Sequence, residues 1–353
     1  MISGSYRKAV LPGNPVFDKI AALCVLIEYI TGQLAWPNEL TLEYWRSNDN
    51  PGADTKKRWE TEGSFVIDVG EKKYHSRGIG SAVTGAIEDL GINLDNREDL
   101  KWLMDVADRN NKTGYLKGYS AKHNMPYLIR ELYKPGSFVN GNTAVEAGAH
   151  VIFTALRYRQ MKKVGSYPRS TDDLAKTSLP YVPASDEPFT LGSYKKQMFC
   201  LGESLPEIEA RLKFWLDAKS RADKADARAA KTADEKATIV AFGDGKNLAT
   251  IRTDDDRLAR ALFTGNRPPD IVIGQPRNGC VQILSNRKHQ GNPRFMKSVE
   301  KLTELLQKVD KASWFFDSRI GAVMNGTRSL KESVPTILTI EAIIDMIAST
   351  VEF

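Results

Sequence analysis

The stretch RKAVLPGNPVFDKIAALCVLIEYITG, residues 7–32, decides the fold of the N-terminal half of this chain. Arg7–Leu11 is a short run typical of a strand, and the turn residues of Pro12–Pro15 close it. From Phe17 to Gly32, apolar residues recur three and four positions apart, as on the wide apolar face of a helix. A strand, a tight turn and a buried helix in this order predict the opening of an α/β unit.

The chain continues this alternation as far as about residue 165. Two more strands are predicted, at Glu39–Trp45 and at Ser64–Val69, the second carrying Asp68 near its C-terminal end. Helices are predicted at Ser81–Leu90, Arg97–Asp108, Ala121–Leu132 and Thr143–Lys163. Such alternation predicts a mostly parallel sheet flanked by helices over residues 1–165. Ligands bind beyond the carboxyl ends of parallel strands, where Pro12–Asp18 and Asp68–Ser81 would lie.

The rest of the sequence predicts a connector and a second domain. Residues 166–237 form the connector, which ends in the Ala-rich, mixed-charge helix Leu205–Ala237. This helix is either a solvated link between domains or a surface for a protein partner. Residues 238–353 predict a smaller C-terminal α/β domain. Its strands are expected at Thr238–Phe242, Asp270–Ile273 and Cys280–Leu284, and its helices at Asp254–Phe263, Met296–Val309 and Thr339–Val351.

Composition bounds the class of protein. With 41% hydrophobic and 27% charged residues over 353 positions, the chain is neither disordered nor fibrous. Its net charge of +6 permits an anionic ligand but does not indicate a nucleic-acid groove. The three cysteines include no CxxC pair and are typical of reduced thiols. The sequence contains neither an apolar leader nor a membrane-length apolar run, so we expect a cytoplasmic protein without a membrane partner.

Three acids stand where the predicted elements begin or end. Asp18, in the first turn of its helix, either favours the helix dipole or binds a metal. Asp68 is costly to bury without a partner at the end of an apolar strand, so it either caps the next turn or meets a cation. Asp108 ends a predicted helix, where a carboxylate opposes the dipole. This position indicates either a solvated end or a bound cation.

A histidine and a glycine-rich turn complete the candidate site. Gly78, Gly80 and Ser81 precede a helix whose first N–H groups could bind a phosphate, although such turns are also common structural features. His75 is a candidate ligand, general base or exposed side chain. Three carboxylates and one histidine suit Mn²⁺ or Mg²⁺. His150, in an apolar predicted helix, is expected to be a hydrogen-bonded core residue.

This set resembles the motifs of the DHH phosphoesterase superfamily of metal-dependent hydrolases, over the first 165 residues or so. The family's first motif, a histidine followed by two acids, falls on residues 12–18. Asp18 matches its second acid, whereas Val16 stands in place of the first acid and Pro12 in place of the histidine. These departures put a second metal ion in doubt.

The other motifs are matched in part. Asp68 in FVIDVG matches the acid that ends a strand, Tyr74-His75-Ser76 stands at the Asp-His-His motif, and Asp108 in LMDVADRNN matches the acid of a later helix. The resemblance implies one Mn²⁺ or Mg²⁺ ion, with Asp68 and His75 as catalytic residues. The implied metal ligands are Asp18, Asp68, His75 and Asp108. Such an ion lowers the pKa of a bound water and polarises a phosphoryl oxygen.

The resemblance also implies a substrate and its contacts. The substrate would be a phosphodiester or phosphoanhydride, such as a short nucleotide or oligonucleotide, bound between the two domains. Its phosphate would be held by Gly78, Gly80, Ser81, Arg277, Arg319 and Arg328. The alternative interpretation of each arginine is ordinary surface charge. Because several motif ligands are missing, an alternative stays open: a catalytically degenerate protein of this fold that binds a nucleotide, a nucleic acid or a protein partner.

Overall fold

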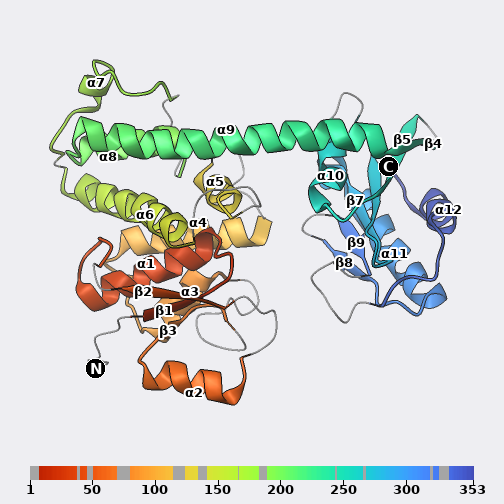
Figure 1. The fold of residues 1–353 in the computed structure, drawn as a ribbon, viewed down its shortest axis with the longest axis horizontal. Helices are drawn as coiled ribbons and strands as arrows, with labels where there is room; N and C mark the ends of the chain where they lie inside the picture. The colour runs from red at the N-terminus through yellow and green to blue at the C-terminus, as the bar shows by residue number, and fades with distance from the viewer. Residues whose placement is uncertain are drawn as a thin grey trace. The chain divides into compact units, whose positions relative to one another are not determined.

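The computed structural model describes residues 8–37, 40–45, 51–69, 80–113, 124–133, 141–165, 167–182, 189–242, 245–264, 268–318, 321–325 and 334–353. The chain divides into two compact units, Met1–Ala222 and Asp223–Phe353. The boundary falls within one long helix, α9 (Leu205–Lys236), as Figure 1 shows. Each unit has its own sheet and its own hydrophobic core.

The stretch that opens the sequence analysis folds as it predicts. Strand β1 (Lys8–Pro12) has a buried centre, and helix α1 (Phe17–Thr31) buries most of its residues. The helix ends at Gly32, whose φ of 67° lies in the left-handed region that glycine adopts without strain. The N–H of Gly32 donates to the Glu28 carbonyl and so satisfies one of the last carbonyls of α1.

The sheet of the first unit is parallel, as predicted. Its order is β2-β1-β3, with β1 between β2 (Thr41–Trp45) and β3 (Phe65–Val66). Val10, at the middle of β1, is aligned with Glu43 on one side and Val66 on the other. Strand β3 is shorter than the predicted Ser64–Val69, because Asp68 takes a φ of 50° and leaves the extended conformation.

The two faces of this sheet are covered by different helices. Ala9 and Leu11 of β1 belong to the main core beneath α1, whereas Val10 packs with Trp59 of α2 (Ala53–Thr61). Figure 1 shows α1 and α2 on opposite sides of the sheet. Helix α2 was not predicted, because Trp59 is its one buried residue and its other side chains are mostly polar.

The remaining helices of the first unit complete the main core. They are α3 (Ala82–Asp89), α4 (Glu98–Thr113), α5 (Met125–Glu131), α6 (Gly141–Val164), α7 (Thr171–Leu174) and α8 (Leu191–Cys200). Helix α4 runs past the predicted end at Asp108, so this acid lies inside a helix rather than at its C-terminus. The first half of α9 adds Ile208, Leu212 and Trp215 to the same core.

The second unit contains a six-stranded mixed sheet. Its order is β4-β5-β6-β7-β9-β8, and only β5 and β6 pair in parallel. The strands are β4 (Thr238–Phe242), β5 (Lys246–Arg252), β6 (Ile271–Gln275), β7 (Gln282–Ser285), β8 (Phe315–Asp317) and β9 (Ala322–Met324). Sequence patterns predicted β4, β6 and β7. They missed β5, which carries polar residues at both ends, and the three-residue strands β8 and β9.

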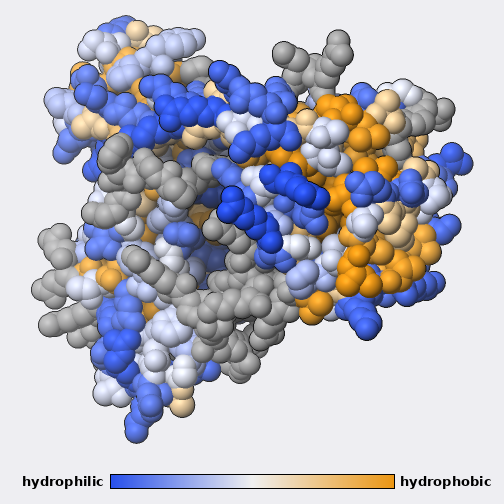
Figure 2. Space-filling view, turned by 45° about the vertical axis from the view of Figure 1, so that its right-hand side comes forward, coloured by the Kyte–Doolittle hydropathy of each residue, from blue (hydrophilic) through white to orange (hydrophobic). Residues whose placement is uncertain are grey.

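Helices cover both faces of this second sheet. Helices α11 (Pro293–Val309) and α12 (Ile340–Thr350) pack on one face. On the other face, α10 (Asp256–Ala261) packs together with Ala229 and Ala233 of α9. The weak apolar stripe of α9 is therefore a packing face for the sheet. Figure 2 shows hydrophobic residues gathered on the surface of this unit. Among its exposed large hydrophobic side chains are Ile239, at 54%, and Ile337, at 70%.

No helix within the described parts of the chain combines the length and apolar character that crossing a bilayer requires.

Candidate functional site

The predicted acids Asp18 and Asp68 lie at the carboxyl edge of the parallel sheet. Asp18 is in the first turn of α1, which follows β1, and Asp68 follows β3. Because β1 and β3 are parallel neighbours, their carboxyl ends meet at one edge. Asp18 is only 2% exposed, so its carboxylate requires a partner.

That partner is Lys19, a residue that sequence reasoning did not single out. The Lys19 Nζ atom lies 2.7 Å from Asp18 Oδ2 and 2.7 Å from Asp68 Oδ2. The three side chains are 12%, 2% and 14% exposed, in the order Lys19, Asp18 and Asp68. The structure therefore brings the two predicted acids together around a cation, as expected for Asp68, and the chain itself supplies that cation.

Electrostatics keep Lys19 charged in this position. Burial disfavours the ammonium, but the nearby carboxylates of Asp18 and Asp68 outweigh that effect and raise the pKa of Lys19. The Lys19 ammonium thus offsets one of the two carboxylate charges. We refer to Asp18, Lys19 and Asp68 as the edge cluster.

The edge cluster does not fit a divalent ion as it stands. Mg²⁺ requires carboxylate oxygens at about 2.0–2.1 Å, and the Lys19 ammonium already holds the position between the two carboxylates. Among the residues that the structure describes, no group of three or more His, Cys, Asp and Glu side chains is placed to hold a metal ion. His75, the predicted fourth ligand, lies outside the described residues.

Asp108, the third predicted acid, binds the start of α3. Its Oδ1 atom accepts hydrogen bonds from the Ser81 backbone N–H at 2.8 Å and from the Thr84 hydroxyl at 2.6 Å. Asn111, also on α4, donates to the Gly80 carbonyl at 2.8 Å. Ser81 is the predicted N-cap, and its hydroxyl accepts from the Thr84 N–H.

These contacts give the predicted phosphate position a different occupant. The Ser81 N–H, expected to face a phosphate, donates to the Asp108 carboxylate. A carboxylate here benefits from the positive end of the helix dipole in the way that a phosphate would. Thr84 and Asn111 were missed. A polar residue three positions after a serine N-cap was the available signal for Thr84.

Of the other predicted phosphate contacts, Arg277 lies among the described residues. Gly78, Arg319 and Arg328 lie outside them. Arg277 belongs to the second unit, and its side chain is 93% exposed. Its backbone N–H donates to Asp254 at 2.9 Å, and its Nε atom lies 3.5 Å from the same carboxylate. Such an exposed pair contributes little to stability.

His150 is hydrogen-bonded, as the sequence predicts, but its side chain is 24% exposed and is therefore only partly buried. Its Nδ1 atom lies 2.7 Å from the buried hydroxyl of Tyr194. Burial, followed by the repulsion of nearby arginines, lowers the pKa of His150 to about 3. The imidazole is therefore neutral at physiological pH and serves packing rather than charge.

The solved structures that are similar to this chain include a DHH domain. No protein-family model matches the sequence, and no curated protein does either. A solved DHH domain, from a protein described as a member of a family of ribosomal proteins, is 14% identical with a TM-score of 0.40, over 98% of this chain and 88% of that one. The chain resembles DHH-domain proteins.

Two other solved structures that are similar to this chain are named as a phosphodiesterase and as RecJ. A pGpG-specific phosphodiesterase from Vibrio cholerae is 11% identical with a TM-score of 0.42, over 98% of this chain and all of that one. RecJ from Thermus thermophilus, solved with Mg²⁺, is 12% identical with a TM-score of 0.31, over 90% of this chain and 46% of RecJ. At such low sequence identities and TM-scores, the similarity does not assign chemistry to this chain. The chemistry of the candidate site is inferred from the residues of this chain alone.

Proposed function

We propose that this chain is a phosphoesterase-like protein of DHH architecture that binds a phosphorylated small molecule or a short oligonucleotide. We further propose that it is catalytically degenerate at the metal position. The observation that carries this proposal is the edge cluster, in which Lys19 Nζ lies 2.7 Å from both Asp18 and Asp68. The class of ligand follows from the DHH-like motifs at Asp68 and Asp108.

The charge balance of the edge cluster supports the degenerate form. A hard divalent ion gains its binding energy from carboxylates that have no competing cation. Here Lys19 already neutralises one of the two negative charges. A divalent ion would have to displace an ammonium that is tethered to the first turn of α1. Displacing the ammonium would also leave a shielded charge without its carboxylate partners, which would weaken the binding of the divalent ion.

The contacts of Asp108 support the same conclusion. Its carboxylate accepts the Ser81 N–H and the Thr84 hydroxyl, two groups that a substrate phosphate at the start of α3 would need. The chain thus fills both the cation position and the anion position with its own side chains. We assign the phosphate of the ligand to basic side chains instead, with Arg277, Arg319 and Arg328 as the predicted contacts.

A second candidate function is Mn²⁺- or Mg²⁺-dependent hydrolysis of a phosphodiester or phosphoanhydride. The observation that favours it is that the Asp18 and Asp68 carboxylates both reach one cation. In that case Lys19 would have to leave the cluster. Asp18, Asp68, Asp108 and His75 would then be the predicted ligands.

Hydrolysis of bis-p-nitrophenyl phosphate separates the two candidates. The wild type and Asp68→Ala should be assayed with and without Mn²⁺, and we expect no Mn²⁺-dependent rate from either. A Mn²⁺-dependent rate in the wild type that Asp68→Ala abolishes would establish the hydrolase instead. Lys176→Ala is the matched control, because this lysine is 76% exposed and pairs with Asp173 outside the edge cluster.

Binding to a short oligonucleotide at two salt concentrations tests the class of ligand. We expect the affinity to fall as salt rises, because neutralised phosphates release counterions. Substituting Arg277 should reduce the affinity and the salt slope together. An affinity that does not depend on salt, or no binding to either an oligonucleotide or a mononucleotide, would contradict the proposal.

A further inference from the structure

We infer that the Lys19 ammonium is a built-in substitute for a divalent cation, so that removing it turns the edge cluster into a divalent-cation site. This inference rests on the proposed function, because it concerns the same cluster. It is tested by metal binding without any substrate, so it can fail while ligand binding stands. Its consequence is that the wild type binds no divalent ion there, whereas a variant without the ammonium does.

The position of the ammonium is that of a bridging ion. Lys19 Nζ is equidistant, at 2.7 Å, from one oxygen of each carboxylate. These distances are those of charge-assisted hydrogen bonds. An ammonium is a compact point charge with three donors, and therefore resembles a small cation more closely than a planar guanidinium does.

The two carboxylates are held in place by the fold. Asp18 is fixed in the first turn of α1, which packs on the sheet, and Asp68 lies two residues after the end of β3 in a left-handed backbone conformation. Both are shielded from solvent, with Asp18 at 2% and Asp68 at 14% exposure. Their convergence therefore depends on the strand pairing of β1 and β3 as well as on Lys19.

Removing the ammonium leaves chemistry that suits a hard cation. Two oxygen ligands of like charge would face each other with no ammonium between them, which is costly in a shielded site. Mg²⁺ and Mn²⁺ are bound by one or two protein carboxylates together with several waters. Methionine preserves much of the length and apolar stem of lysine without its charge. Lys19→Met therefore changes the charge with little change in packing.

Mn²⁺ titration of the full chain by calorimetry tests this inference. The variants are the wild type, Lys19→Met and Lys19→Met/Asp68→Asn, with Lys176→Met as an exposed matched control. We expect Lys19→Met to bind one Mn²⁺ at least tenfold more tightly than the wild type does. We also expect its unfolding temperature to rise with Mn²⁺. Both gains should be lost in the double variant and absent from the control.

Two results would overturn the inference. One is Mn²⁺ binding by the wild type that Asp68→Asn removes, because Lys19 would then coexist with the metal. The other is a folded Lys19→Met protein that gains no Mn²⁺ affinity over the wild type. If Lys19→Met does not fold without metal, folding upon Mn²⁺ addition supports the inference. If it does not fold in either condition, Lys19→Gln replaces it, because the glutamine amide can still donate to one carboxylate, and the same two results then decide.

Discussion

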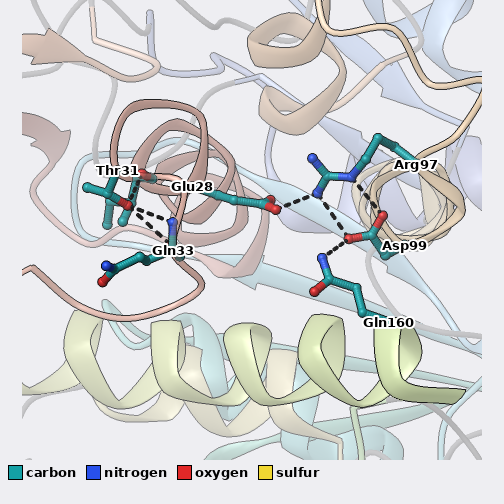
Figure 3. Close-up of polar contacts among 7 residues, drawn as sticks. Glu28, Thr31, Gln33, Arg97, Asp99 and Gln160 are labelled. Carbon is teal, nitrogen blue, oxygen red and sulfur yellow. Dashed lines mark hydrogen bonds and ion pairs between the residues drawn. The ribbon is translucent and has the colours of Figure 1, made fainter. Parts of the chain in front are cut away.

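The two ends of helix α1 carry the same charges in different arrangements. At its start, Lys19 lies between Asp18 and Asp68. Near its end, Arg97 lies between Glu28 and Asp99 (Figure 3). In each of these sets of three described residues one cation lies between two carboxylates, so the charges of the three residues do not distinguish them.

Geometry does distinguish them. Arg97 donates to Asp99 through two nitrogens, each at 3.0 Å, and to Glu28 at 2.6 Å. Gln160 of α6 donates to the same Asp99 at 2.8 Å. The planar guanidinium and the amide thus connect α1, α4 and α6 through directional bonds. The C-terminal network is a structural clamp, whereas the point-like ammonium of Lys19 could be exchanged for another cation.

Removing the arginine should give the largest loss of stability. Arg97→Met leaves Asp99, which is 6% exposed, and Glu28 without their cation. Removing one partner of a buried pair costs about 3–5 kcal/mol. Urea unfolding of the full chain measures this loss, and Mn²⁺ should not restore it. A loss below about 1 kcal/mol would show that the clamp is only a surface contact.

Removing the lysine should give a smaller and reversible loss. Lys19→Met should lower the free energy of unfolding by about 3 kcal/mol without metal, because Lys19 makes one contact to each carboxylate whereas Arg97 makes three hydrogen bonds. Mn²⁺ should restore much of this loss, because ligand binding to the native state stabilises it. Equal responses of Lys19→Met and Arg97→Met to Mn²⁺ would abolish the distinction between the two ends.

Replacing Arg97 by lysine should reduce stability less than removing it. The replacement separates the effect of the guanidinium geometry from that of the positive charge. Arg97→Lys keeps the positive charge but loses the pair of guanidinium N–H donors that bind Asp99. The free energy of unfolding should fall by about 1.5 kcal/mol, the contribution of one charge-assisted hydrogen bond. Unfolding in urea at pH 7 measures the difference from the wild type. If the exchange costs nothing, charge rather than geometry holds the C-terminal end of α1.

The smallest effect should appear in the response to acid. For Asp99, burial is outweighed by the bonds from Arg97 and Gln160, so its pKa is lowered. Its stabilisation is therefore present above the unfolded pKa of about 3.9 and is lost as pH falls through the folded value. Burial outweighs Arg97 at Glu28 and raises its pKa, so its contribution is present at low pH and is lost as pH rises.

Single neutral substitutions separate these two contributions. Between pH 5 and pH 3, the free energy of unfolding should fall less in Asp99→Asn than in the wild type. In Glu28→Gln it should fall more. Urea unfolding at the two pH values, compared with the wild type, measures both slopes. The same slope in all three proteins would contradict the assignment of opposite shifts to the two carboxylates.

Prediction from sequence worked best where the signal was local. The β1–turn–α1 unit follows from hydrophobic spacing and from a glycine that can take φ of 67° at the helix end. The N-cap at Ser81 was recognisable because its bond reaches only three residues along the chain. Helix α2 and the short strands β8 and β9 were missed because each offers too few buried residues to form a period.

The candidate site was predictable in position but not in content. Parallel strands end at one edge, so Asp18 and Asp68 could be placed at that edge because each follows a predicted strand; the structure adds that these strands are neighbours. The role of Lys19 could not be predicted in this way, because adjacent residues on a helix do not share a face and its partner Asp68 is distant in sequence. The direction of the side chain, set by packing at the sheet edge, decides that it points to both acids.

The residues of this chain therefore determine an α/β unit with acids at the carboxyl edge of its sheet, since hydrophobic period, caps and strand polarity are properties of short segments. Only the tertiary structure decides what those acids bind. Asp68 meets Lys19, and Asp108 meets the first N–H groups of α3. Both contacts join segments that are brought together by burial of the core, so their energies depend on distances and shielding that no local pattern encodes.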